Sequence, residues 1–114
     1  MHRGEVWLVN LDPTVGAEIK KTRPAIIVSD DAIGILPLRV VVPVTEWKRR
    51  YAVAPWMVRL DPGEESGLDK TSAADAFQVR SVAQERLVRQ LGAISDVGMQ
   101  EIAEALAVVL HIRT

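Results

Sequence analysis

The chain has 114 residues, the length of one ordinary domain, and its apolar and charged fractions of 48% and 25% are those of a globular protein. The absence of cysteine excludes disulfide bonds and thiolate metal sites, and the net charge of −1 argues against a domain that coats nucleic acid non-specifically. No apolar run approaches the roughly 20 residues of a membrane helix, and the first residues lack the apolar centre of a signal peptide. We therefore expect one cytoplasmic domain, residues 1–114, with no membrane partner.

Three β-strands are predicted in the first half of the chain. Residues 5–11 (EVWLVNL) are rich in Val, Trp and Leu and end at an Asp-Pro turn. Residues 24–29 (PAIIVS) form an unbroken apolar run, which predicts burial on both faces. Residues 38–47 (LRVVVPVTEW) predict a third strand, in which Pro43 marks a bulge or an edge because proline donates no ladder hydrogen bond.

The second half of the chain predicts two further strands. Residues 55–60 (PWMVRL) precede the turn signal DPG, and a shorter strand is expected over residues 76–79. The two longest loops then cover residues 12–23 and 61–74. Loops of this length usually carry function, so both are candidates for the site.

Two helices follow in the prediction. Ser81 and Gln84 have capping-box spacing, which predicts a short helix ending near Arg86. Ser95 is expected to cap a C-terminal amphipathic helix over residues 96–112. Five short strands and a terminal helix favour a mainly β fold, a small SH3-like barrel with the C-terminal helix packed on it.

Basic residues are concentrated in the first half of the chain. Residues 1–60 hold nine Lys and Arg against six Asp and Glu, whereas residues 61–114 hold five against nine. The cations gather in the loop GAEIKKTRP and in the segment EWKRRY. A bound polyanion would therefore occupy a local patch.

Three segments carry a resemblance to a known family. RGEVWLVNLDPTVGAEIKKTRPAIIVS, VVPVTEW and SAADAFQVRSV, in this order, resemble the MazF/PemK (Kid) toxin endoribonucleases of bacterial type II toxin–antitoxin systems. The most specific element is Gly-x-Glu-x₄-Arg-Pro after a Leu-Asp-Pro-Thr turn. The likeness covers nearly the whole chain.

The resemblance implies a homodimeric toxin with an SH3-like barrel, neutralised by a cognate antitoxin encoded beside it. Such toxins cut single-stranded RNA at short sequence motifs without a metal, through attack of the 2′-hydroxyl that leaves a 2′,3′-cyclic phosphate and a 5′-hydroxyl. By position, the family's catalytic Arg falls on Arg23, its catalytic Thr on Thr45 and a Gln of its RNA groove on Gln78. The His of the Kid loop is replaced by Ala17, and the Arg-x-Asp pair that precedes Gln in Kid is missing, so we expect the Arg/Thr mechanism of the MazF branch.

The chemistry of phosphodiester cleavage assigns roles to three of these residues. Arg23 suits charge stabilisation, because a guanidinium stays protonated and its fork matches two phosphate oxygens. The Thr45 hydroxyl can donate to a phosphate oxygen or to the 2′-oxygen. Glu18 has two open interpretations: a general base, or an ion pair that orders the loop against Lys20 or Arg23.

Nine further residues are predicted to contact RNA, through cationic attraction, stacking or the third motif. They are Lys20, Lys21, Trp47, Lys48, Arg49, Ser72, Asp75, Gln78 and Arg80. For EWKRRY the alternatives are a solvated hairpin tip, with Trp47 in the core, or a surface that contacts the acidic tail of an antitoxin.

Two other functions remain open at this point. A CcdB-like gyrase poison shares the fold, but that family ends in Trp-Gly-Ile, whereas this chain ends in HIRT. A non-catalytic SH3-like binding module would explain the barrel but not the set of Glu18, Arg23 and Thr45. His2 and His111 lie at opposite ends of the chain and outside the motifs, and no His, Asp or Glu cluster has metal-ligand spacing, so no cofactor or metal is expected.

Overall fold

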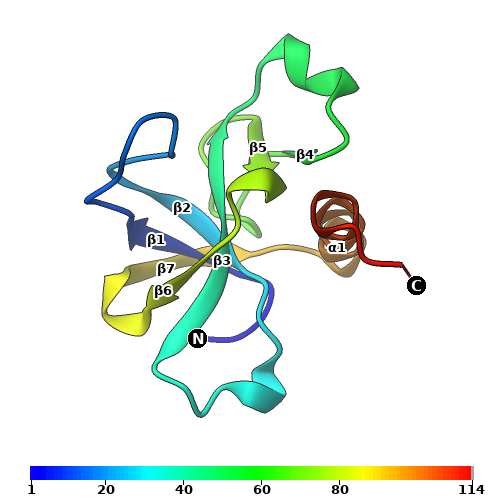
Figure 1. Ribbon diagram of the computed structural model, residues 1–114. Coiled ribbons are helices and arrows are strands. Elements are labelled where there is room, and N and C mark those ends of the chain that lie inside the picture. Colours follow the sequence, from blue (N-terminus) through cyan, green and yellow to red (C-terminus); the bar gives the residue numbers. More distant parts are fainter. Residues whose placement is uncertain (114) are drawn as a thin grey trace.

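The computed structural model describes residues 1–113 as a strongly bent antiparallel sheet with one long helix beside it (Figure 1). The sheet contains seven strands, and four short 3₁₀ turns, η1 to η4, lie between them. The elements are β1 (Glu5–Asn10), β2 (Thr22–Ile27), η1 (Asp31–Ile33), β3 (Leu38–Glu46), η2 (Arg49–Val53), β4 (Met57–Leu60), β5 (Ser72–Asp75), η3 (Ala76–Gln78), β6 (Arg80–Ala83), η4 (Gln84–Arg86), β7 (Leu87–Ala93) and α1 (Asp96–Leu110). This confirms the mainly β fold with a C-terminal helix, with a barrel-like sheet that is not closed.

Strand β3 organises the sheet. The strand order is β4-β5-β3-β2-β1-β7, and β6 also pairs with β3. The first part of β3 pairs with β6 as far as Val41, and its last part pairs with β5 from Val44 onward. Pro43 lies between these two pairings, so the missing N–H of proline falls where β3 changes partner.

Two apolar cores lie on the two faces of the bent sheet. Alternation along β2 sends Ile26 to the core under α1, whereas Ala25 and Ile27 join the other core. Both sets are fully buried, which confirms the predicted burial of this strand on both faces. Ile102 and Ala105 of α1 complete the first core.

The predicted strands before residue 61 are present with small changes in their ends. β2 begins at Thr22, before Pro24, because Thr22 and Arg23 already pair with Asn10 and Val9 of β1. Pro24 pairs with Leu8 of β1, and it stands one residue before the ladder to β3 begins at Ala25. The predicted helix at the C-terminus is confirmed as well.

Helix α1 begins as its capping pattern predicts. The Ser95 hydroxyl accepts a hydrogen bond from the Gly98 N–H at 3.2 Å. The helix ends at Leu110 rather than at Ile112, because His111 adopts a left-handed conformation with φ of 54°.

Of the two expectations for residues 76–86, one is wrong and one is right only in part. The strand expected over residues 76–79 is the turn η3, since Asp75 caps it by accepting from the Phe77 N–H, and the strand lies earlier, in β5. The first residues of the expected short helix, 81–83, belong to β6, because Ser81 pairs with Val40 of β3 and sheet pairing prevails over the local capping pattern. Its last residues form the 3₁₀ turn η4, Gln84–Arg86. Strand β7 was not predicted at all.

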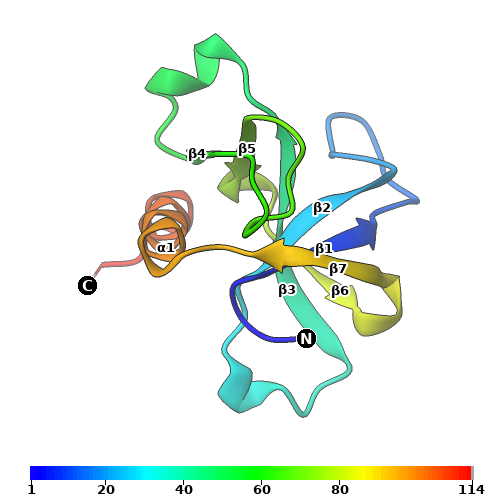
Figure 2. The same ribbon diagram turned by 180° about the vertical axis from the view of Figure 1, so that it is seen from behind.

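Two connections that matter for function project from the same end of the sheet. The β1–β2 loop (residues 11–21) and the β3–β4 connection (residues 47–56) lie in the upper half of Figures 1 and 2, opposite the β2–β3 connection. In residues 1–113 none of the helices combines the length and the apolar character needed to cross a bilayer.

Candidate active site

Arg23 and Thr45 lie on neighbouring strands at this end of the sheet. In the β2–β3 ladder the pairing starts at Ala25 and Pro43, and Arg23 and Thr45 each lie two residues beyond this pair on their own strand. Two motif residues that are 22 positions apart in sequence thus lie on adjacent strands, just past the same end of the ladder.

Both residues line one groove with a volume of about 450 Å³. One wall comes from the connection of residues 61–71, which lies against β7 (Figure 2). The Ala93 N–H donates to the Glu65 carbonyl at 2.8 Å, and a Cβ on Gly67 would lie 2.0 Å from the Leu91 carbonyl oxygen. Only glycine permits this close approach, so Gly67 fixes the wall. The full lining is Leu8, Arg23, Pro24, Val44, Thr45, Glu46, Gly67, Leu68, Asp69, Lys70, Ser72, Arg89 and Leu91.

Arg23 is held at one edge of its guanidinium. Its Nε donates to the Lys20 carbonyl at 2.9 Å, and no other side-chain bond to it is found within residues 1–113. Both terminal nitrogens therefore remain available to an anion. Half-burial of Arg23, at the start of a paired strand, limits its motion.

The groove holds five charged side chains. Glu46 and Lys70 pair with each other at 3.4 Å, both largely exposed, and Asp69 belongs to the wall. Arg89 enters from β7. Sequence reasoning missed Asp69, Lys70 and Arg89, because the first two lie outside the family motifs and the third lies on the unpredicted strand.

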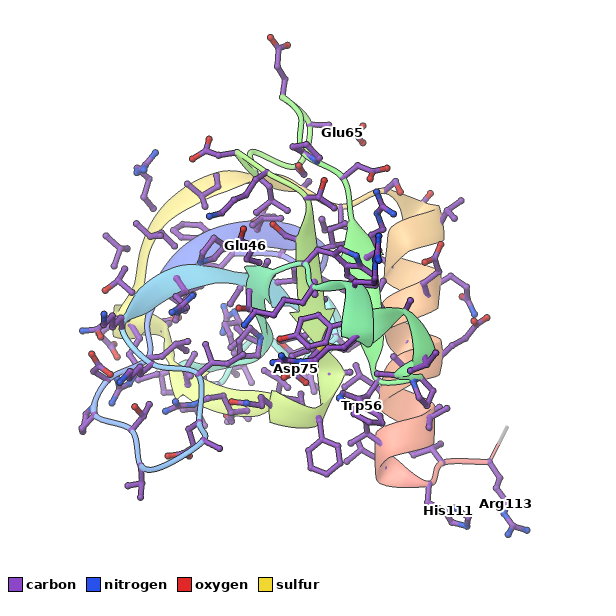
Figure 3. All side chains as sticks on the ribbon, turned by 90° about the horizontal axis from the view of Figure 1, so that it is seen from above. Glu46, Trp56, Glu65, Asp75, His111 and Arg113 are labelled. Carbon is purple, nitrogen blue, oxygen red and sulfur yellow. The ribbon has the colours of Figure 1, made fainter. Side chains whose placement is uncertain are left out.

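Ser72 and Asp75, two residues of the third motif, are buried and engaged inside the fold. The Ser72 hydroxyl lines the groove and donates to the Lys70 carbonyl at 2.8 Å. Asp75 lies toward the middle of the molecule (Figure 3), and its carboxylate accepts from the Phe77 N–H at 3.1 Å. Burial raises the pKa of Asp75, against the lowering effect of hydrogen bonds from the Phe77 and Gln78 backbone.

A second hollow, of about 490 Å³, lies between the β1–β2 loop and η3. Gln78 ties these two segments together: its Oε1 accepts from the Ile19 N–H at 2.6 Å, and its Nε2 donates to the Ala17 carbonyl at 3.1 Å. The amide is thus bound to loop backbone at both ends. We call this space the loop hollow, and its lining is Ala17, Glu18, Ile19, Pro43, Phe77, Gln78, Val79 and Arg80.

Two arginines fasten the first end of the same loop, and Asp12 joins this end to the last residue of the loop. Arg80 donates to the Leu11 carbonyl at 3.1 Å, and Arg86 donates to the carbonyls of Asn10 and Asp12. The Asp12 carboxylate in turn accepts from the Lys21 N–H at 3.0 Å. Arg80 therefore supports the loop, and sequence reasoning missed Arg86.

Glu18 lines the loop hollow and not the groove of Arg23 and Thr45. Its Oε1 accepts from the Val15 N–H at 2.5 Å, and its own N–H donates to the Val15 carbonyl at 3.2 Å. No ion pair joins Glu18 to Lys20 or Arg23 among residues 1–113. Glu18 contacts the loop backbone and, within the described part of the chain, forms neither of the ion pairs that one of its two interpretations requires.

The remaining predicted contacts divide into two exposed groups. Lys20 and Lys21 extend from the loop next to Arg23. Lys48 and Arg49 are exposed at the start of η2. Trp47 is half-buried, meets Tyr51 edge-on at 5.9 Å between ring centroids, and carries the Arg59 guanidinium 5.8 Å above its ring. This packing leaves Trp47 partly accessible beside the groove residue Glu46.

The histidines stay apart. His2 lies 3.7 Å from Asp31, and His111 follows α1, with Arg113 beyond it (Figure 3). Within the described chain, residues 1–113, no cluster of three or more His, Asp or Glu side chains is arranged to hold a metal ion.

Comparisons with known proteins identify the family of the chain. The profile of the family described as "PemK-like, MazF-like toxin of type II toxin-antitoxin system" matches residues 2–110. Endoribonuclease MazF9 of Mycobacterium tuberculosis is 38% identical over 98% of both chains, and Endoribonuclease PemK of Escherichia coli is 36% identical over 96% of this chain and 82% of its own.

Solved structures agree in fold. MazF of Deinococcus radiodurans has a TM-score of 0.80 at 25% identity, covering 98% of this chain and 97% of its own. A mycobacterial endoribonuclease solved with its cognate antitoxin also has a TM-score of 0.80, at 24% identity over 100% of this chain and 98% of its own. The chain belongs to the PemK-like, MazF-like toxin family of type II toxin–antitoxin systems.

Proposed function

We propose that the protein is a toxin endoribonuclease that cuts single-stranded RNA at a short sequence motif without a metal. The observation that carries this proposal is the groove that Arg23 and Thr45 line from the adjacent strands β2 and β3. Among relatives, MazF9 and PemK bear the name endoribonuclease, which supports RNA as the substrate.

In the proposed reaction the ribose 2′-oxygen forms a bond to the adjacent phosphorus, and the bond from phosphorus to the 5′-oxygen breaks. The products are a 2′,3′-cyclic phosphate and a 5′-hydroxyl. Arg23 neutralises the charge that grows on the non-bridging oxygens, because its terminal nitrogens are free and its fork fits two oxygens. Thr45 donates its hydroxyl to the same phosphate from the adjacent strand.

Protons must leave the 2′-hydroxyl and reach the 5′-oxygen. The carboxylates that share the groove with Arg23 are Glu46, which pairs with Lys70, and Asp69. Glu18 lies in the loop hollow, so in this proposal it braces the loop and does not accept the proton. Lys20, Lys21, Lys48 and Arg49 attract the strand to this end of the sheet, and Trp47 offers a face for base stacking.

The proposal includes two protein partners. A homologous fold has been solved in complex with its cognate antitoxin, which supports an antitoxin as the regulator of this chain. A homodimer is expected of this family. The match to the PemK-like, MazF-like family favours a nuclease over a gyrase poison or a non-catalytic binding module.

The test is cleavage of mixed single-stranded RNA in excess EDTA, followed by mapping and chemical analysis of the new ends. We expect cuts at one short motif, with cyclic phosphate and 5′-hydroxyl ends. Arg23→Ala protein, purified in the same way, controls for contaminating nuclease. Intact RNA, or cleavage that requires magnesium, would contradict the proposal.

A further inference from the structure

Arg89 of β7 lines the same groove as Arg23 of β2, and strand β1 lies between their two strands. Leu8 of β1 pairs with Pro24 on one side and with Arg89 on the other. Strands β2 and β7 therefore stand two strand spacings apart, about 10 Å. Both arginines line the groove across this separation.

The guanidinium of Arg89 is free of internal partners. No hydrogen bond or ion pair to its side chain is found within residues 1–113, and neither Glu46 nor Asp69 of the groove lies within salt-bridge distance of it. The other cations nearby are engaged: Lys70 pairs with Glu46. Arg86, three residues earlier, donates to loop carbonyls. Arg89 thus lines the groove, and all of its guanidinium N–H groups remain available to a ligand.

An arginine in this setting is suited to phosphate, because its planar fork binds two oxygens and its charge does not titrate near neutral pH. The separation of β2 from β7 favours contact with different phosphate groups over joint contact with one. We propose that Arg89 binds a phosphate next to the scissile one, while Arg23 binds the scissile phosphate itself. This inference rests on the proposed function, and it makes Arg89 a binding residue that positions the strand.

The proposal predicts a dependence on substrate length. A hexaribonucleotide with the mapped cleavage step at its centre carries neighbouring phosphates, whereas the unphosphorylated dinucleotide of that step carries only the scissile one. Arg89→Ala should raise KM for the hexanucleotide about tenfold or more with kcat nearly unchanged, which is the scale of one charged hydrogen bond. The same variant should leave kcat/KM for the dinucleotide unchanged.

Salt gives an independent measurement. With a hexanucleotide whose cleavage step carries a 2′-deoxyribose, so that it binds without being cut, the slope of log affinity against log salt should become shallower by about 0.7 in Arg89→Ala, the value for one phosphate contact on a single strand. Arg89→Lys should restore part of the affinity. Arg113→Ala, which removes a cation beyond helix α1, is the matched control and should behave as wild type.

Three results would overturn the inference. The first is a KM for the hexanucleotide that is the same in Arg89→Ala as in Arg113→Ala. This result is expected if the charge of Arg89 only protects the edge strand. The second is an equal loss on both substrates, which would assign Arg89 to the scissile phosphate. The third is a loss confined to kcat. Thermal unfolding of each variant checks that the protein is folded. If Arg89→Ala is unfolded, Arg89→Gln, which retains a polar side chain of similar size, replaces it in both measurements. Wild-type protein that cuts neither substrate would overturn the proposed function, and this inference with it.

Discussion

The groove and the loop hollow both draw residues from strand β3, but they use their polar side chains differently. In the groove Arg23 keeps two nitrogens free, and Arg89 has no internal partner within residues 1–113. In the loop hollow both ends of the Gln78 amide bind backbone, and Arg80 donates to a carbonyl. The polar residues of the two hollows thus divide into those left open for a ligand and those that hold the loop.

This contrast bears on the two interpretations of Glu18. Its carboxylate closes a turn with Val15 in the loop hollow. A base that serves Arg23 would need to share the groove with it. The structure therefore favours the brace.

The largest effect should come from the groove. Arg23→Ala should lower the single-turnover rate of RNA cleavage by about 10²–10³, or about 3–4 kcal/mol, the scale for one donor to an oxyanion. The fold should persist, because within residues 1–113 the side chain makes a single hydrogen bond, to the Lys20 carbonyl. Arg39→Ala, at the other end of β3, is the control, and activity equal to that control would remove Arg23 from the mechanism.

A smaller effect, on stability, is expected from the loop hollow. Gln78→Leu removes two hydrogen bonds of about 1 kcal/mol each, so urea unfolding should show a loss of about 2 kcal/mol. Tryptic cleavage after Lys20 or Lys21 should become faster as the loop is released. Gln100→Leu, on the exposed face of α1, should change neither property. Loss of RNA affinity with an unchanged rate of loop proteolysis would instead make Gln78 an RNA contact.

Asp75 should produce a still smaller, pH-dependent effect. Burial raises the pKa of Asp75, so the folded state binds the proton more tightly than the unfolded state does. The free energy of unfolding that Asp75 contributes is therefore lost as the pH rises through the pKa of the folded state. Asp75→Asn keeps an oxygen to cap η3 and removes that charge. The stability of wild type relative to this variant should fall between pH 3 and pH 7 in urea titrations. A relative rise would contradict the raised pKa. Asp75→Ala should lose about 1 kcal/mol with the cap.

The smallest effect is expected at Glu18. Glu18→Gln retains the oxygen that accepts from the Val15 N–H, so cleavage should stay within about threefold of wild type if the residue is a brace. A general base would give a far larger loss. Rates measured from pH 5 to 9 distinguish the two, because removing the base would also abolish the acid limb of the profile.

The sequence predicted the parts of the fold that local pattern determines. Pro43 signals an irregular position in β3, and Ser95 signals the start of α1, since both depend on neighbouring residues. Ser81 misled because pairing with β3, which is distant in sequence, decides the conformation of β6, and only Gln84–Arg86 of the expected helix form a 3₁₀ turn. Strand β7 was missed since shifts in its register with β1 interrupt the alternation that marks a strand.

The candidate site divides in the same way. The family motif identified Arg23 and Thr45, and the ladder between β2 and β3 explains why two distant motifs meet. Contacts between Gln78 and the loop span about 60 residues and leave no local signal. Arg89 could be found only after β7 was placed beside β1.

The central claim is that the groove, and not the loop hollow, holds the phosphate that is cut. A crystal structure of the protein with an RNA that carries one 2′-deoxyribose at the mapped cleavage step tests this most directly. We predict that the phosphate after this sugar lies between Arg23 and Thr45, with the loop still bound to Gln78. A scissile phosphate in the loop hollow, beside Glu18 and Gln78, would contradict the account.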